Sequence, residues 1–227
     1  MEVNVISFDF GGTLAFETEE DYKVYYKILT SFGFHFSLNL LKSAFDKART
    51  IWIAKQQKGE IWNEERMLEL VKDMLSFIGI SDEELAIKVI NLWSENVNFK
   101  VYDDVVETLD ELTKNKYKLI VISNVSSEKN LKIYLSRCGL QKYFSHLVAS
   151  GTVGIEKPNK EIFLLASRIL GVKAHRILHV GDNYESDYIG AKNAGLKAIL
   201  LDRLGKHSGK DALMIKSLSE LIEVLNL

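Results

Sequence analysis

Four segments of this chain carry residues suited to chemistry, and they lie far apart in the sequence. Asp9 precedes two glycines, Ser123 ends an apolar run, Lys157 lies in a polar segment, and Asp182 and Asp187 form a spaced acidic pair. Carboxylates are the ligands that a small hard cation such as Mg²⁺ prefers. An ammonium group stabilises negative charge that lies close to it. Brought together, these charged and polar side chains would form one site suited to chemistry.

The elements that must position these residues are strands alternating with helices. Apolar runs predict strands at 3–8, 118–122, 146–149, 177–180 and 197–201. Helices are expected near 103–115, 128–138, 186–194 and 218–225, and from Pro158, in the first turn, to a stop at Gly171. This alternation predicts an α/β fold with a Rossmann-like parallel sheet covered on both faces. Ligands bind beyond the carboxyl ends of such strands, where Asp9, Ser123 and Asp182 are expected to meet.

The pattern differs between the first strand and about residue 100. Apolar residues recur there at spacings of three and four, which predicts a helical bundle without strands. We therefore predict a core domain at 1–15 and 100–227, with a helical domain inserted at 16–99. The expected helix N-caps are Ser37, Asn63 and Ser81. The aromatic residues expected to fill the core of the bundle, rather than stack on a substrate, include Tyr22, Tyr25, Trp52, Trp62 and Trp93.

Composition excludes several classes of function. The 227 residues carry a formal net charge of −2, so no field that would gather nucleic acid is expected. The single cysteine, Cys138, allows no internal disulfide, which favours a reducing compartment. The start of the chain, MEVNVISFDF, lacks the basic region of a signal peptide, and no apolar run is long enough to span a bilayer. We expect a cytoplasmic protein, monomeric or homodimeric, that binds neither nucleic acid nor membrane.

Four motifs resemble the signature segments of the haloacid dehalogenase (HAD) superfamily. They are FDFGGTL (8–14), VISN (121–124), GIEKPNKEIF (154–163) and VGDNYESD (180–187), in the same order as in that family. The resemblance covers the expected core domain, and the helical insert has the position of the family's cap domain. Each segment is weak alone, but the four together in strand–loop–helix contexts are a specific signal.

The resemblance implies roles in phosphoryl transfer for particular residues. Asp9 would attack phosphorus and form an aspartyl-phosphate, and Thr13 would add a hydroxyl bond near this nucleophile. The phosphate-binding set would be Gly12, Ser123, Asn124 and Lys157. Taken alone, Asp9 would instead be a strand-end cap and Lys157 a solvated loop lysine.

The resemblance also implies a Mg²⁺ cofactor. Its ligands would be Asp9, the backbone carbonyl of Gly11, and Asp182, with Asp187 shared or one step removed. Taken alone, Asp187 would instead cap the helix expected near Ser186. The predicted reaction is Mg²⁺-dependent hydrolysis of a small phosphate monoester, and the predicted partner is a small phosphorylated metabolite.

One position departs from the family pattern. HAD phosphatases have a second aspartate two residues after the nucleophile, which protonates the leaving group, and this chain has Gly11 instead. Three consequences stay open. The substrate has a good leaving group; Glu17, Glu19 or Glu20 of the insert supplies the acid; or the protein binds phosphate with little turnover.

Two other branches of the family also lack that aspartate. A 2-haloacid dehalogenase would use Arg49 for its carboxylate substrate, and a phosphonoacetaldehyde hydrolase would use Lys47, Lys55 or Lys58 as a Schiff base. The GDxxxxD form of the last motif favours the phosphatase over the dehalogenase, and solvated charges are the simpler interpretation of the three lysines. The histidines are expected to have no role, including His179 in the strand before Asp182.

Overall fold

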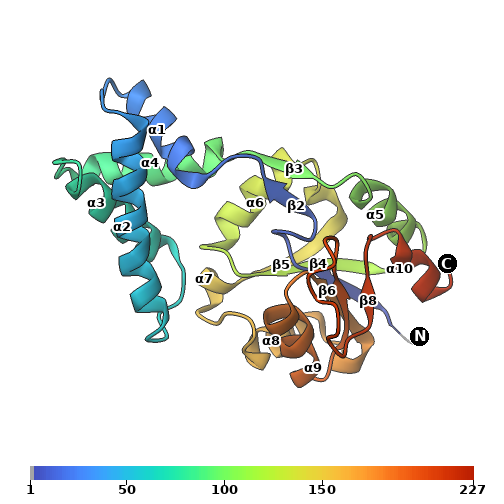
Figure 1. The fold of residues 1–227 in the computed structure, drawn as a ribbon. Coiled ribbons are helices and arrows are strands. Elements are labelled where there is room, and N and C mark those ends of the chain that lie inside the picture. The colour runs from blue at the N-terminus through green and yellow to red at the C-terminus, as the bar shows by residue number, and fades with distance from the viewer. Residues whose placement is uncertain (1–2) are drawn as a thin grey trace. The chain divides into compact units, whose positions relative to one another are not determined.

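The computed structural model describes residues 3–227, which form two compact units. The core unit comprises the chain up to Phe16 together with Lys100–Leu227, and the helical unit comprises Glu17–Phe99 (Figure 1). The chain therefore leaves the core unit shortly after its first strand and returns to it near residue 100.

The core unit is built on a parallel sheet. Within residues 3–227 its strand order is β5-β4-β1-β6-β7-β8. The strands are β1 Val5–Phe8, β4 Lys118–Ser123, β5 Phe144–Ala149, β6 Ile177–Gly181, β7 Lys197–Leu201 and β8 Met214–Ile215. β1 lies between β4 and β6, with Phe8 opposite Val121 on one side and Val180 on the other. The predicted α/β fold with a parallel sheet is confirmed.

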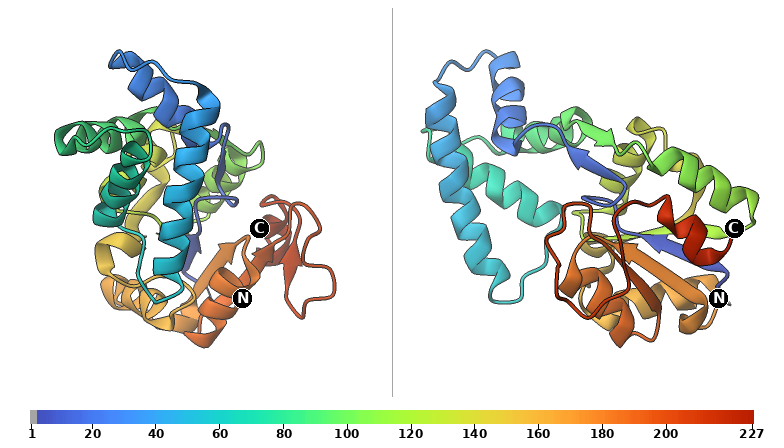
Figure 2. Two further views of the ribbon diagram at one scale, coloured as in Figure 1. Left: turned by 60° about the vertical axis from the view of Figure 1, so that its left-hand side comes forward. Right: turned by 45° about the vertical axis from the view of Figure 1, so that its right-hand side comes forward.

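Helices cover both faces of this sheet. They are α5 Val105–Lys114, α6 Glu128–Arg137, α7 Ser150–Val153, α8 Lys160–Leu170, α9 Gly190–Asn193 and α10 Glu220–Leu225. Short helical turns η1 (Gln141–Tyr143), η2 (Ala174–Arg176) and η3 (Tyr184–Ile189) join them. α8 and α9 lie on one face, and α5, α6 and α10 lie on the other (Figures 1 and 2). Phe163 of α8 packs with Val5 and Ile120 in one buried cluster, so the central strands are apolar on the face under α8.

Two helix starts differ from the predictions. Pro158 lies before α8, and the helix begins after Asn159, whose side chain accepts a hydrogen bond from the Glu161 N–H. The helix expected near Ser186 begins earlier, as the π-helical turn η3, because the Asn183 side chain accepts from the N–H groups of Glu185 and Ser186. The predicted stop at Gly171 is confirmed, since this residue is in the left-handed conformation that glycine adopts without strain.

The helical unit contains α1 (Asp21–Ser31), α2 (Leu38–Gln56), α3 (Glu64–Ser76) and α4 (Glu83–Asn96). Ser37 and Asn63 cap α2 and α3 as predicted. Ser81 was wrong by one residue: Asp82 caps α4, where its charge also suits the helix N-terminus. The predicted aromatic residues pack in or against this unit's own buried cluster: Tyr22, Tyr25, Trp52, Trp62 and Trp93.

A short two-stranded sheet forms where the chain crosses between the units. β2 (Ala15–Glu17) pairs with β3 (Phe99–Val101), although no strand was predicted between residues 18 and 100. That prediction was wrong because three residues are too few to show the alternation by which a strand is recognised.

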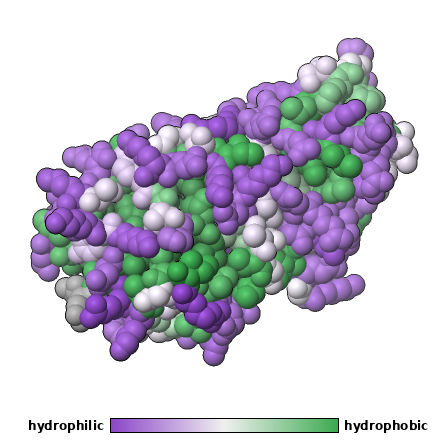
Figure 3. Space-filling view, turned by 180° about the vertical axis from the view of Figure 1, so that it is seen from behind, coloured by the Kyte–Doolittle hydropathy of each residue, from purple (hydrophilic) through white to green (hydrophobic). Residues whose placement is uncertain are grey.

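One face of the molecule carries both polar and apolar side chains. Seen from behind, hydrophilic side chains lie over much of this face, and apolar side chains gather in a broad area between them (Figure 3). Among residues 3–227, no helix combines the length and apolarity needed to cross a bilayer.

Candidate active site

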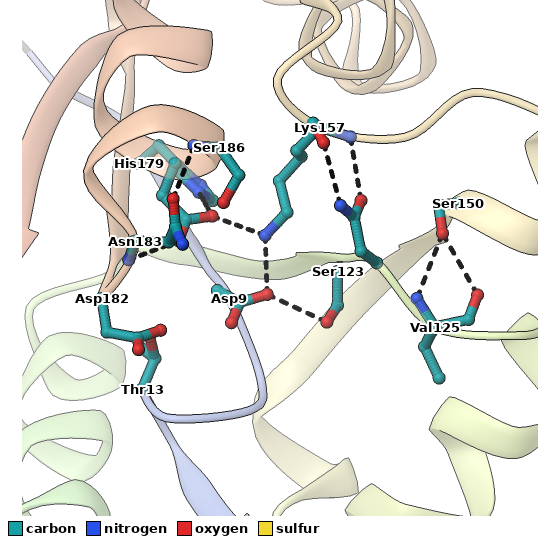
Figure 4. A network of polar contacts seen from close by, with 12 residues as sticks. Asp9, Thr13, Ser123, Val125, Ser150, Lys157, His179, Asp182, Asn183 and Ser186 are labelled. Carbon is teal, nitrogen blue, oxygen red and sulfur yellow. Dashed lines mark hydrogen bonds and ion pairs between the residues drawn. The ribbon is translucent and has the colours of Figure 1, made fainter. Parts of the chain in front are cut away.

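The predicted site residues of the core unit meet at the carboxyl ends of its central strands (Figure 4). Asp9 follows β1, Ser123 ends β4, and Asp182 follows β6. Lys157 comes from the loop before α8, and Asp187 comes from η3. With four further residues they line a cleft of about 280 Å³: Gly11, Asn124, Asn183 and Ser186.

Lys157 is the centre of the site. Its Nζ lies 2.6 Å from Oδ1 of Asp9 and 2.6 Å from Oδ1 of Asp187, and only 2% of its side chain is exposed. Burial lowers the pKa of Lys157, but the charges of Asp187 and Asp9 outweigh this and raise the pKa above its usual value. The ammonium is therefore charged and holds the two carboxylates together.

Asp9 has one of its oxygens fixed by two donors. The hydroxyl of Ser123 donates to Oδ1 at 2.9 Å, and Lys157 donates to the same atom. Burial raises the pKa of Asp9, which the Lys157 ammonium opposes. Because both contacts end on Oδ1, Oδ2 is the oxygen left to attack a substrate.

Asp182 carries the least compensated charge of the site. Burial, followed by the charges of Asp9 and Asp187, raises the pKa of Asp182 to about 6. Thr13 donates its hydroxyl to Asp182 at 3.3 Å, so this hydroxyl lies against the last motif rather than against the nucleophile.

These carboxylates fit a divalent cation. One oxygen from each of Asp9, Asp182 and Asp187 lies within 4.8 Å of the others. When all three are ionised, the single charge of Lys157 leaves a local charge of −2, which such a cation neutralises. Oxygen donors of this kind suit Mg²⁺.

Asp187 is already bound on both of its oxygens. Oδ1 accepts from Lys157, and from Nε2 of His179 at 3.3 Å, while Oδ2 accepts from the Asn183 N–H at 3.0 Å. Burial pushes the pKa of Asp187 up, but Lys157 and His179 outweigh it and hold the pKa well below its usual range. Asp187 is better placed to orient its neighbours than to serve as the main cation ligand, and it lies inside η3 instead of capping it.

Asn124 holds the loop that carries Lys157. Its amide nitrogen donates to the backbone carbonyl of Lys157, and its amide oxygen accepts from the Lys157 N–H, both at 2.9 Å. Each end of the side chain thus makes one contact with Lys157, and the amide nitrogen keeps a second N–H. Asn124 positions Lys157, and its predicted phosphate contact is left to that second N–H or to the backbone.

The two glycines after Asp9 have different surroundings. Gly12 has a φ of +78°, and a Cβ there would collide with the carboxylate of Asp182. Its N–H donates to the Ala15 carbonyl at 2.8 Å, so this N–H is already used, and the phosphate contact of Gly12 stays a prediction. Gly11 lines the cleft, and a Cβ there would meet no atom within 4 Å.

The loop after Asp9 is fastened to the core unit by Arg203. The guanidinium donates to the Thr13 carbonyl at 3.0 Å and to both oxygens of Asp104 at 2.8 and 2.9 Å. It also stacks over the ring of Tyr102, 3.9 Å from the ring centre. Sequence reasoning missed this arginine because it lies about 190 residues from the loop that it holds.

His179 was expected to have no role and was missed as well. It is fully buried, with Nδ1 2.8 Å from the hydroxyl of Ser7 and Nε2 facing Asp187. Ser7 lies opposite it in the β1–β6 register. The available signal was a lone histidine in an apolar strand, and only the register shows its polar partners.

Comparison with known proteins agrees with this geometry. A family model described as haloacid dehalogenase-like hydrolase matches residues 3–195. The chain therefore belongs to the haloacid dehalogenase-like hydrolase family.

Some known proteins match this chain over part of their length, and a solved structure matches it over nearly all of its length. The chain is 37% identical over 142 residues to the glyceraldehyde 3-phosphate phosphatase of Methanothermobacter thermautotrophicus, which covers 57% of this chain and 62% of that protein. It is 34% identical over 138 residues to haloacid dehalogenase-like hydrolase domain-containing protein 3 of Danio rerio, covering 59% and 56%. The matches thus span less than two thirds of these relatives. The solved 2-haloacid dehalogenase of Pseudomonas syringae pv. tomato DC3000 superposes with a TM-score of 0.75 at 25% identity, covering 99% of this chain and 98% of that one.

The raised pKa of Asp182 predicts pH-dependent binding of Mg²⁺. A carboxyl with a pKa of about 6 is mostly protonated at pH 5, so the proton competes with the cation. Its contribution to the stability of the metal-free fold is present at low pH and is lost as the pH rises through 6. We expect the Kd for Mg²⁺, measured by calorimetry, to be about tenfold weaker at pH 5 than at pH 7.5. Asp182→Asn should remove both the binding and its pH dependence, and equal Kd values at the two pH values would contradict the assignment.

The neighbouring glycines provide a matched pair of variants. Gly12→Ala forces a side chain into a left-handed backbone and against Asp182, so it should cost about 1–2 kcal/mol of unfolding free energy and weaken Mg²⁺ binding at least about tenfold. Gly11→Ala adds the same methyl group in open space and should change stability by less than about 0.5 kcal/mol. Urea unfolding and calorimetry test both variants, and equal losses would refute the close approach of Gly12 to Asp182.

Proposed function

We propose that this protein is a Mg²⁺-dependent phosphatase that hydrolyses a small phosphate monoester through an aspartyl-phosphate on Asp9. The observation that carries the proposal is the convergence of three carboxylates and one buried ammonium on a single cleft. The similarity to proteins named glyceraldehyde 3-phosphate phosphatase supports a phosphate ester as substrate. The substrate class that we propose is a small phosphorylated metabolite.

The first step is attack by Oδ2 of Asp9 on phosphorus. A bond forms between that oxygen and phosphorus, and the bond from phosphorus to the ester oxygen breaks, so the alcohol leaves as an alkoxide that takes a proton from solvent. Ser123 and Lys157 hold Oδ1, which orients the carboxylate, and the Lys157 ammonium reduces repulsion between two anions.

The second step is hydrolysis of the acyl phosphate. Water attacks the aspartyl-phosphate, phosphate is released, and the Asp9 carboxylate is regenerated together with one proton. Lys157 stays charged throughout, because Asp9 and Asp187 raise its pKa. Its role is therefore electrostatic and not that of a base.

The proposed cation ligands are Asp9, Asp182 and the backbone carbonyl of Gly11, with Asp187 acting through its contacts. Bound there, Mg²⁺ would supply positive charge for the phosphoryl oxygens. The chain's own part is to keep these oxygens close despite their repulsion, which Thr13, Ser123 and Lys157 do through the hydrogen bonds described above.

The alternative branches of the family are less well supported. A Schiff-base lysine must lose its proton, but the hydrogen bond from Lys55 to Glu69 (2.7 Å) raises the pKa of Lys55. The ammonium of Lys47 lies over the Phe77 ring, 5.6 Å from its centre. For a dehalogenase, Arg49 lies within the helical unit near the carboxyls of Glu17 and Asp21, where burial raises the pKa of both and its charge lowers it.

The three glutamates considered as substitutes for the missing acid differ in the pKa of their carboxyl groups. Glu19 is paired with Lys27, and Glu20 with Lys23, and these contacts lower the pKa of both carboxyls. Burial and the nearby Asp21 carboxyl raise the pKa of Glu17 to about 7, although its side chain keeps contact with solvent. Glu17 alone among these three therefore retains a proton near neutral pH.

Asp9→Asn tests the proposed reaction. The amide is a poor nucleophile, so turnover of p-nitrophenyl phosphate should fall at least about 10³-fold, and the wild type should lose turnover when EDTA removes divalent cations. Asp202→Asn is the matched control, because Asp202 also follows a strand but caps the next turn through the N–H groups of Lys206 and His207. It should keep turnover within about tenfold. A wild type that binds phosphate but hydrolyses no activated ester would favour the phosphate-binding alternative.

Gly11→Asp tests the consequence of the missing acid. The cleft has room for this side chain, because a Cβ at Gly11 meets no atom within 4 Å. If leaving-group protonation limits the rate, kcat/KM for an alkyl phosphate should rise about 10²-fold, with little change for p-nitrophenyl phosphate, whose leaving group needs no proton. Gly11→Asn has the same shape without the acid and should show no such gain. An equal gain for both esters would refute this explanation.

A further inference from the structure

The buried histidine behind the site has a connection that its sequence position does not reveal. His179 lies within β6, is 0% exposed, and meets the ring of Phe163 edge-on with 5.0 Å between ring centres. Both of its nitrogens have partners: Ser7 at 2.8 Å and Asp187 at 3.3 Å. Burying a polar ring is costly unless its nitrogens are hydrogen-bonded, so an apolar residue would fill this place more simply.

The direction of the hydrogen bond to Asp187 follows from this partner. An ionised Asp187 only accepts, so Nε2 of the ring must carry the proton that faces it. On the other side of the ring, Nδ1 lies 2.8 Å from the Ser7 hydroxyl, which also lies 3.4 Å from the Leu178 carbonyl. The ring is thus held at both nitrogens, by Ser7 at Nδ1 and by Asp187 at Nε2.

These contacts continue to the nucleophile. The oxygen of Asp187 that accepts from His179 also accepts from Lys157 at 2.6 Å, and Lys157 in turn donates to Asp9. The other oxygen of Asp187 is held by the Asn183 N–H. Removing His179 would leave Oδ1 with Lys157 as its sole donor among the described residues, so the carboxylate would be held less tightly, by Lys157 and Asn183 alone.

We propose that His179 is a positioning residue that, with Ser7 behind it, fixes the carboxylate of Asp187 and thereby aligns Lys157 and the cation-binding oxygens with Asp9. The proposal rests on the proposed function, because it assigns His179 to the Mg²⁺ site. It predicts that the donor facing Asp187 matters for metal binding, whereas a ring that only fills space would matter for stability alone.

Two near-isosteric variants separate these possibilities. In His179→Gln the side-chain amide nitrogen can occupy the place of Nε2 and keep a donor for Asp187. In His179→Asn the shorter amide reaches only the place of Nδ1 and loses that donor. Both remove the ring from Phe163, so both should lower the thermal stability of the metal-free protein.

Metal binding should then differ between the two variants. We expect the Kd for Mg²⁺ alone, measured by calorimetry, to stay within about threefold of wild type for His179→Gln and to weaken by about 10- to 100-fold for His179→Asn. Mn²⁺ binding followed by electron paramagnetic resonance should show the same order. Equal Kd values for the two variants would overturn the proposal.

Ser7→Ala keeps the histidine and its packing and serves if the His179 variants do not fold. It removes the polar partner that holds the ring at Nδ1, so it should weaken Mg²⁺ binding by a smaller factor in the same direction; an unchanged Kd would count against the proposal. A wild type that binds no Mg²⁺ would instead refute the proposed function. The two failures are therefore distinguishable.

Discussion

The site depends on one electrostatic constraint: three carboxylates crowd around a single buried ammonium. Lys157 contacts Asp9 and Asp187 but leaves Asp182 without a cationic partner among the described residues, and burial with like charges raises the pKa of Asp182 to about 6. Buried ion pairs of this kind contribute little net stability, because desolvation of the charges cancels much of their attraction. The cluster is better understood as a set of carboxylates that could hold a divalent cation than as a source of stability.

The fold keeps these charges together through backbone connections. Parallel strands end at one edge of the sheet, so Asp9 and Asp182 are adjacent because β1 and β6 are adjacent. The site loops are held by side chains that hydrogen-bond to their backbone groups. Asn124 binds the N–H and carbonyl of Lys157, and Arg203 binds the carbonyl of Thr13. Fixing the backbone in this way lets the side chains stay close despite their repulsion, which is the arrangement that electrostatic catalysis requires.

Much of the fold and part of the site could be predicted from local sequence. Asp9 and Asp182 each follow an apolar run, so their place at a strand end is a local property. The contact between His179 and Ser7 depends on the register of strands about 170 residues apart, which no local pattern contains. The same limit explains why Arg203 was missed. The error at Ser81 is of another kind, because Asp82 beside it is an equally good cap and only the backbone conformation decides between them.

Gly11 removes a general acid from its usual place in the family without changing the arrangement of charged groups in the site. A general acid typically raises the rate about 10²–10⁴-fold. In the proposed reaction, Asp9, Lys157 and a bound cation would act on the phosphoryl group, and their contributions would not depend on a general acid. A site that keeps these contributions and lacks the acid loses rate in proportion to how strongly its leaving group needs a proton. The space beside Gly11 is open, so the loss is one of chemistry and not of shape. Under the proposed function, this site would select among phosphate esters by the acidity of the alcohol that leaves, in addition to any selection by fit.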